Sequence, residues 1–186
     1  MKTELKNIAN IQTGVFAKAV AKGDMVYLQP KYYDEDGNRV TEVVPDLNSI
    51  GISANHHLQP GDILFSSKGT KNFATCFDDE DMNAAASTSF FVVRLQDRNV
   101  LPEFLTWHLN QPTTMSYLKA FAKGSSIPSI SKEVLGKTEI TVPSIQKQQL
   151  ICKIAKLTTY EKQIHSKLME LRNEFYQQKL YTALNN

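Results

Sequence analysis

The sequence predicts an α+β fold, with a mixed or antiparallel sheet in a domain at residues 1–143 and one long coiled-coil helix at residues 144–186. Short runs of β-branched and aromatic residues, separated by turn signals, fill the first hundred residues, as expected for strands. Helix signals follow, and no proline or glycine occurs after Pro143. Strands and helices in separate blocks are typical of α+β domains.

The long C-terminal segment carries apolar residues at heptad spacing. Glu161 interrupts the pattern at an a position, and Gln178 follows at a d position. This spacing is the seam of a coiled coil, and one helix cannot bury such a seam by itself. We therefore predict that it pairs with a partner through Leu150, Ile154, Leu157, Ile164, Leu168, Leu171 and Phe175.

Two kinds of partner fit this seam: the preceding domain or another long helix. A helix that lies on its own domain is usually much shorter than forty residues. A polar residue inside a seam, such as Glu161, is typical of an oligomer, where it fixes the register at a cost in stability. The pattern favours a second helix, and we predict a homodimer through residues 150–178.

Several stretches of the first domain predict strands. The first ends at Gly14, and turns at Asp36-Gly37 and Pro60-Gly61 separate later ones. The segment 89–95, rich in β-branched and aromatic residues, predicts a strand. The other candidates are residues 25–29, 40–44, 63–65, 73–77 and 138–142.

Helix signals begin after residue 100. Pro102 and Pro112 each fit the first position of a helix, and Gly124 is placed to terminate the second one. Ser131 caps a predicted one-turn helix, and Ser144 is a candidate cap for the long helix.

Composition excludes several classes of protein. Hydrophobic content of 41% and charged content of 22% are ordinary for a globular protein. No apolar run is long enough for a membrane span, and Met1 leads into polar sequence rather than a signal peptide. Cys76 and Cys152 lack metal-site spacing, which favours a reducing, cytoplasmic location.

The net charge of +2 is unevenly distributed. Residues 144–186 hold seven basic and three acidic residues, whereas residues 1–143 hold fourteen and sixteen. A basic surface for nucleic acid would therefore have to be local.

Four motifs follow one another along the chain. They are IANIQTG at residues 8–14, LQPGDILF at 58–65 followed by Lys68-Gly69, GSSI at 124–127 with Ile130 and Leu135, and ITVPSIQKQQLI at 140–151. Each motif is weak alone, but the ordered set spans nearly the whole chain. It resembles the target-recognition half of the specificity subunits of type I restriction–modification systems.

The resemblance implies a DNA-reading domain followed by a conserved helix. The usual subunit carries two such domains, and its two helices pair antiparallel and hold the readers apart on DNA. Methyltransferase subunits dock on this arrangement, and an endonuclease subunit can join them. The present sequence has one reader and one helix, so it resembles a half-size subunit or one half of a longer subunit. The heptad seam requires the partner helix that is missing here.

No catalytic constellation is visible in the sequence. A DNA adenine methyltransferase would need an Asn/Asp-Pro-Pro-Tyr/Phe pocket and a glycine-rich cofactor loop, and neither occurs. Pro45-Asp46 and Glu4-Leu5-Lys6 stand in the wrong order for a metal-dependent nuclease. His56-His57 has no second ligand group at a useful spacing and is interpreted as part of a turn. We therefore predict no enzymatic activity, no metal and no cofactor.

DNA binding needs cations for phosphates and polar loop side chains for base edges. A single lysine is more often a solvated charge, and adjacent serines can serve as a cap or a turn. Four candidate clusters are Lys18 with Lys22, Lys31 with Tyr32 and Tyr33, the loop residues Lys68, Thr70, Lys71 and Asn72, and Lys123 with Ser125 and Ser126. DNA binding depends on which of these clusters lie on the same face of the domain.

Two functions remain open at this point. The first is a non-catalytic DNA-specificity subunit, with double-stranded DNA, methyltransferase subunits and a second copy as partners. The second is a coiled-coil protein–protein interaction module without DNA specificity. The net charge of −2 in residues 1–143 predicts weak DNA binding by the chain alone and firmer binding within a methyltransferase complex.

Overall fold

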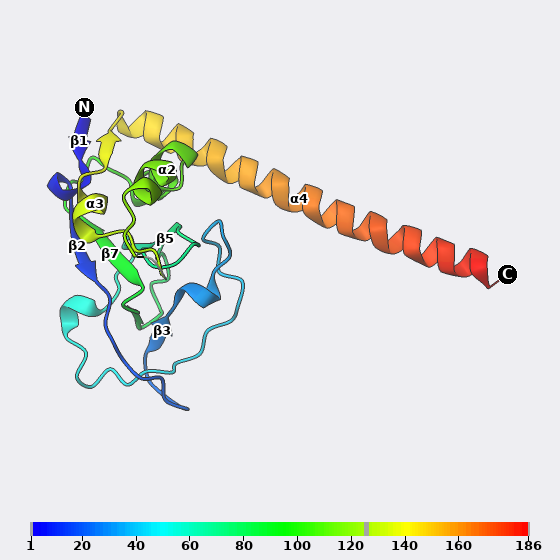
Figure 1. Ribbon diagram of the computed structural model, residues 1–186, viewed down its shortest axis with the longest axis horizontal. Coiled ribbons are helices and arrows are strands. Elements are labelled where there is room, and N and C mark those ends of the chain that lie inside the picture. Colours follow the sequence, from blue (N-terminus) through cyan, green and yellow to red (C-terminus); the bar gives the residue numbers. More distant parts are fainter. Residues whose placement is uncertain (1, 125–126, 186) are drawn as a thin grey trace. The chain divides into compact units, whose positions relative to one another are not determined.

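The computed structural model describes residues 2–124 and 127–185, and the chain forms two compact units (Figure 1). Unit 1 is Met1–Gln148 and unit 2 is Gln149–Asn186. The long helix begins where the sequence predicts it. The boundary between the units falls one turn later, because the side chain of Gln148 is fully buried in unit 1.

Unit 1 contains short strands and short helices, and unit 2 is the remainder of one long helix. The described strands are β1 (Lys2–Glu4), β2 (Ala9–Thr13), β3 (Val26–Leu28), β4 (Ile63–Ser66), β5 (Ala74–Cys76), β6 (Ala84–Ala86), β7 (Phe90–Leu95) and β8 (Glu139–Thr141). The α-helices are α1 (Pro102–Leu109), α2 (Pro112–Ala120), α3 (Lys132–Gly136) and α4 (Ile145–Leu184). Single-turn 3-10 helices occupy Leu5–Asn7, Pro30–Tyr32 and Ala54–His56.

The centre of unit 1 is an antiparallel sheet in the order β2-β7-β4-β5. Strand β4 is buried on both faces, and so is the first part of β7, which explains their continuous apolar sequences. One core cluster contains Leu64, Phe90 and Val92 from this sheet together with Phe73. At the β5 edge, the Asn110 side chain accepts from the Ala74 N–H at 2.7 Å and donates to the Ala74 carbonyl at 2.8 Å. This amide covers part of an edge that would otherwise be open.

Two further strand pairs complete unit 1. Strand β3 pairs in parallel with β6, and β1 pairs antiparallel with β8. The sequence did not predict β6, because three alanines carry little strand signal. Gly14 lies so close to the backbone at the end of β6 that a Cβ there would be 2.4 Å from the Ala86 carbonyl oxygen, so only glycine fits.

The predicted strand at residues 40–44 is wrong. Val40 donates one hydrogen bond to the Tyr32 carbonyl, but this segment forms no strand. Val40 and Val44 are exposed, so their β-branched side chains have no buried face to stabilise a strand.

The predicted helices are confirmed. Helices α1 and α2 start at their prolines, and the Ser131 hydroxyl accepts a hydrogen bond from the Val134 N–H at 3.2 Å. Helix α2 ends at Ala120, before Gly124, whose φ of 116° suits glycine. None of the helices in the described part of the chain combines the length and apolarity that a membrane crossing requires.

The first turn of α4 is held in unit 1 by Gln148. Its amide accepts from the Leu101 N–H at 2.9 Å and donates to the carbonyls of Asn99 at 2.8 Å and Pro143 at 2.9 Å. A fully buried amide needs such partners, and this one uses both its oxygen and its nitrogen. The motif at residues 140–151 thus has a structural role at the start of the long helix.

Candidate DNA interface

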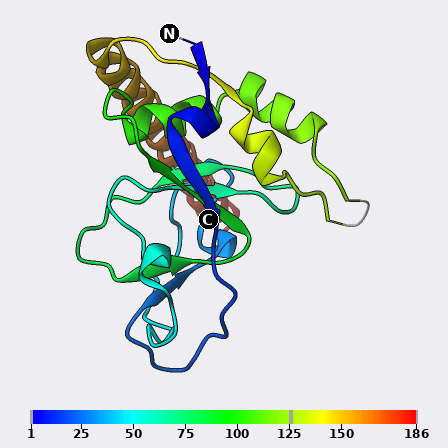
Figure 2. The ribbon, with the colours of Figure 1, turned by 90° about the vertical axis from the view of Figure 1, so that its left-hand side faces the viewer.

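Two of the four predicted DNA-binding clusters lie side by side. Lys68 and Lys123 both form backbone bridges to Ser129. The Gly69 N–H donates to the Pro128 carbonyl at 2.8 Å, and the Ile130 N–H donates to the Ser67 carbonyl at 2.9 Å. Figure 2 shows the loop that follows β4 next to the chain that leads from α2 to α3. We call residues 67–72, 121–124 and 127–130 together the basic loop pair.

Side chains inside the first loop fix its shape. The Ser66 hydroxyl donates to the Lys71 carbonyl at 3.0 Å, and the Asn72 amide donates to the Ser66 carbonyl at 3.0 Å. Gly69 has a φ of 86°, which a glycine adopts without strain. Asn72 therefore braces the loop in this structure, whereas Lys68, Thr70 and Lys71 are exposed.

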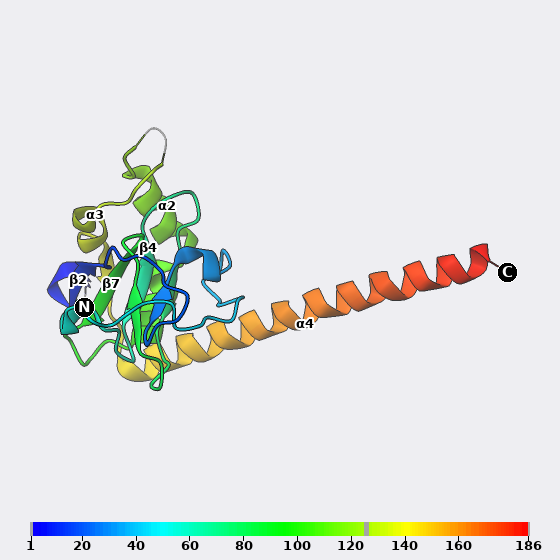
Figure 3. The ribbon, with the colours of Figure 1, turned by 90° about the horizontal axis from the view of Figure 1, so that it is seen from below.

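The cluster of Lys31, Tyr32 and Tyr33 adjoins the basic loop pair through the neighbouring Glu35. Lys71 Nζ lies 3.4 Å from Glu35 Oε1, and both side chains are exposed. The Tyr33 ring lies 5.5 Å from the Phe73 ring, and burial raises the pKa of Tyr33 to about 12. Lys31 Nζ lies 5.0 Å from the centre of the Tyr32 ring. Figure 3 shows these loops on the same unit as α2. Tyr33 thus packs in the core, and Lys31 remains at the surface.

The cluster of Lys18 and Lys22 is held by other parts of unit 1. In the segment that carries these lysines, the Val20 N–H donates to the Asp46 carbonyl at 2.8 Å. The Gly23 N–H donates to the Pro45 carbonyl at 3.0 Å. Both lysines are exposed, and within the described chain their segment is bonded to residues 45 and 46 rather than to the basic loop pair. Ser125 and Ser126 lie outside the described residues.

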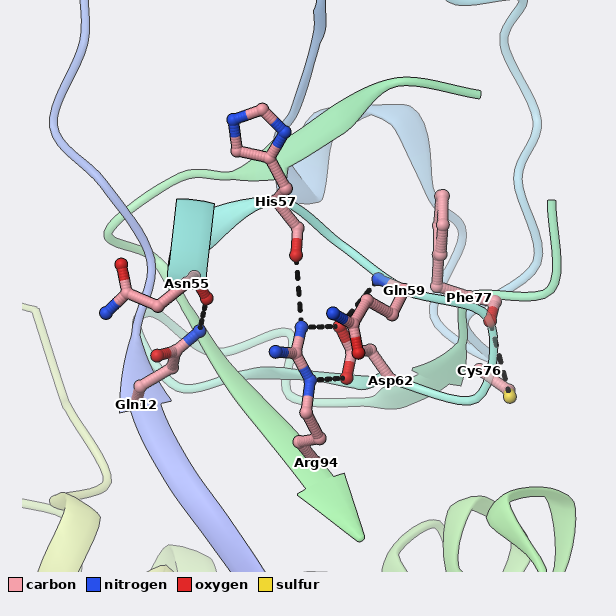
Figure 4. Close-up of polar contacts among 8 residues, drawn as sticks. All are labelled: Gln12, Asn55, His57, Gln59, Asp62, Cys76, Phe77 and Arg94. Atoms are coloured by element: carbon pink, nitrogen blue, oxygen red, sulfur yellow. Dashed lines mark hydrogen bonds and ion pairs between the residues drawn. The ribbon is translucent and has the colours of Figure 1, made fainter. Parts of the chain in front are cut away.

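An ion pair between the buried Asp62 and the partly buried Arg94 joins the start of β4 to β7, at the opposite end of β4 from residues 67–72 (Figure 4). Asp62, which is 1% exposed, accepts from Arg94 Nε at 2.7 Å and from Arg94 Nη2 at 2.6 Å. The same carboxylate accepts from the Gln59 N–H at 2.8 Å, and Arg94 also donates to the His57 carbonyl at 3.0 Å. The hydrogen bond to Asp62 raises the pKa of Arg94. Asp62 can be buried because its charge is paired with that of Arg94 and its oxygens accept hydrogen bonds.

This ion pair gives the LQPGDILF motif a structural role. Gly61 adopts a φ of 90°, and Asp62 then connects the turn to β7 through Arg94. Sequence reasoning missed the pair, although an arginine near the end of an apolar strand was a signal of a buried partner. His56 and His57 lie at and just after a single-turn helix. No group of three metal-ligating side chains occurs among the residues that the structure describes.

The sequence matches a known family over most of its length. The family model for the type I restriction modification DNA specificity domain matches residues 1–173. A curated relative, the type I restriction enzyme HindI specificity subunit of Haemophilus influenzae, is 33% identical over 100 residues, which are 52% of this chain and 22% of the relative. Because the family match includes unit 1 as well as much of α4, it does not favour a module whose function resides in the helix alone.

Solved structures share the fold. An S subunit of a type I restriction-modification system from M. genitalium has a TM-score of 0.61 at 14% identity, covering 94% of this chain and 42% of that chain. The HsdS subunit from Thermoanaerobacter tengcongensis has a TM-score of 0.65 at 16% identity, covering 88% and 43%. A chain from a study of the assembly of a type I R-M system has a TM-score of 0.70 at 17% identity, covering 94% and 46%. The present chain therefore spans less than half the length of each of these relatives.

Proposed function

Because the chain belongs to the family of type I restriction-modification DNA specificity domains, we propose that it is a DNA-reading subunit of such a system, with one reader and one spacer helix. The family is non-catalytic and supplies recognition within a restriction–modification complex. The observation that carries the proposal is the match over residues 1–173, which includes both the reader and most of the helix. On this proposal unit 1 reads a half-site, and α4 joins two readers.

The basic loop pair is the proposed DNA-contacting surface. Lys68, Lys71 and Lys123 are exposed on two adjacent segments, and cations on loops are suited to phosphate oxygens. Thr70 is an exposed hydroxyl in the same loop and can reach a base edge or a phosphate. The other predicted contacts, Lys18, Lys22, Lys31 and Tyr32, extend this surface if the DNA passes along the other loops of unit 1.

Partner subunits complete the proposed site. In residues 1–143 sixteen acidic residues outweigh fourteen basic ones, which gives a net charge of −2. A protein with few phosphate contacts binds DNA weakly at physiological salt. Methyltransferase subunits that dock on this chain would add a basic surface and the catalytic residues, and an endonuclease subunit can join the assembly.

A second copy is the proposed partner of α4. Two identical readers related by a two-fold axis would see the same half-site, so the recognised DNA should be an interrupted palindrome. The 40 residues of α4 span roughly 60 Å at 1.5 Å per residue. The half-sites should therefore lie about one helical turn apart or more.

Methylation mapping tests this function directly. Genomic DNA from cells that express the cognate methyltransferase subunit is sequenced for modified bases, with and without this chain. We expect a modified, interrupted palindrome that appears only when the chain is present. A continuous site or unlike half-sites would contradict the symmetric arrangement, and no chain-dependent methylation would contradict the function itself.

A further inference from the structure

Two aromatic side chains stay exposed at the end of α2. Tyr117 is 41% exposed and Phe121 is 53% exposed, and the centres of their rings lie 5.1 Å apart. Residues four positions apart lie on the same face of a helix, so the two rings form one apolar surface. The helix itself is anchored in unit 1 by Thr114 and Leu118, which are buried. A pair of large aromatic rings that stays exposed on an anchored helix indicates a binding surface.

The sequence around this aromatic pair is basic. Residues 104–132 contain no aspartate or glutamate. The lysines of this stretch are Lys119, Lys123 and Lys132. Its net charge is therefore +3, within a part of the chain, residues 1–143, whose net charge is −2. The next acidic residue, Glu133, is paired with Lys137 Nζ at 2.6 Å. An apolar surface among unpaired cations is complementary to a polyanion.

Another exposed apolar side chain of unit 1, Ile50, has acidic surroundings instead. It follows Ser49, whose hydroxyl donates to the Asp24 carboxylate at 2.5 Å, and Asp46 lies four residues before it. Carboxylates repel the phosphates of a nucleic acid. Exposure alone therefore does not single out the aromatic pair, but exposure together with local charge does.

The basic loop pair places cations next to the aromatic pair. Lys68 and Lys123 each form an antiparallel bridge to Ser129. Residues directly opposite one another in antiparallel segments point to the same face, so both lysines lie on the face of Ser129. Phe121 precedes Lys123 by two residues, where α2 leads into the basic loop pair (Figure 3). A phosphate bound by Lys123 thus places the adjoining nucleotides beside Phe121.

We propose that Phe121, backed by Tyr117, inserts between two neighbouring base pairs of the bound DNA. This inference rests on the proposed DNA-reading function and adds a wedge to its site. Phe121 is the more exposed ring and lies closer in sequence to Lys123, so it enters the base stack, whereas Tyr117 supports it from the helix. Apolar side chains that enter a base step in this way partly unstack it and kink the duplex.

A methyltransferase subunit is the other partner that an exposed aromatic pair can receive. The centres of protein–protein interfaces are depleted in lysine. Nucleic-acid sites, in contrast, combine aromatic rings that stack on bases with cations that follow the backbone. Lys119 and Lys123 lie within two residues of Phe121, so the composition favours DNA.

The fluorescence of 2-aminopurine, a base analogue that brightens when it is unstacked, tests the wedge. The full chain and the cognate methyltransferase subunit are bound to duplexes that carry the mapped site, each with the analogue at a different position. The modified base and its neighbours are left out, because a methyltransferase itself flips its target base out of the stack. We expect one further step with raised fluorescence in each half-site.

Phe121→Ala should abolish this signal and weaken DNA binding about tenfold, as expected for the loss of an aromatic ring that stacks on a base. The salt slope of binding should not change, because no charge is removed. Lys123→Ala should instead reduce the slope by about 0.9 per half-site. Tyr117→Phe keeps the supporting ring, and Ile50→Ala is the matched control. Both should bind DNA within about twofold of the unchanged chain.

Several outcomes would overturn the wedge. They are the absence of a raised signal with the unchanged chain, a signal that persists in Phe121→Ala, and an unchanged affinity of that variant. If Phe121→Ala binds the methyltransferase subunit more weakly without DNA, the aromatic pair docks protein instead. In all these cases the DNA-reading function survives if methylation mapping finds a chain-dependent site. Circular dichroism checks that each variant is folded, which we expect because Phe121 is half-exposed.

Discussion

Replacing both Lys68 and Lys71 with alanine should weaken DNA binding and reduce its dependence on salt. Each phosphate contact contributes about 0.9 to the slope of log affinity against log salt, so two lost charges change it by up to about 1.8 per half-site. To contact DNA, Lys71 must give up its ion pair with Glu35, in which Nζ lies 3.4 Å from Oε1. An exposed ion pair of this kind contributes only about 0–1 kcal/mol to stability, so the loss is small. We therefore expect a change of roughly 1–2 in the slope per half-site.

The assay is fluorescence anisotropy with a DNA duplex that carries the mapped site, in the presence of the cognate methyltransferase subunit. Titrations between about 50 and 200 mM salt give both the affinity and the slope. The control replaces Lys2 and Lys6 with alanine, which removes the same charge; these two lysines form ion pairs with Glu139 and Glu4 rather than with the basic loop pair. An unchanged affinity and slope in the Lys68/Lys71 variant would refute the assignment of this loop to DNA.

Four further outcomes are expected. Arg94→Ala should lower the free energy of unfolding in urea by about 3 kcal/mol, because the buried Asp62 carboxylate loses its partner, and a loss below about 1 kcal/mol would contradict this. Leu168→Glu should make the chain monomeric by light scattering, because it places a charge in the seam, and an unchanged mass would contradict the paired seam. The purified chain should neither methylate nor cleave DNA with S-adenosylmethionine and magnesium present, and cofactor binding in calorimetry would overturn this. Deletion of residues 158–164, one heptad, should keep both half-sites and shorten the mapped spacer by about three base pairs, since α4 loses about 10 Å; an unchanged spacer would show that α4 does not set it.

Local sequence signals predicted much of the fold because local forces determine those elements. The prolines that start α1 and α2, the Ser131 cap and the absence of breakers in α4 all act within a few residues. The strand predicted at residues 40–44 was wrong because strand formation needs a partner that the local sequence does not specify. The alanines of β6 were missed for the converse reason: their strand exists because β3 pairs with it.

In the candidate site, too, some features follow from the local sequence and others depend on tertiary contacts. The sequence by itself determined the heptad seam, the family motifs and the four groups of polar loop residues, because each is a property of residue type and spacing. Only the tertiary structure decided that Lys68 and Lys123 flank the same Ser129 backbone, that Asn72 braces its own loop, and that Asp62 pairs with Arg94. These contacts join residues far apart in the chain, and their formation depends on sheet pairing and loop closure rather than on any local preference.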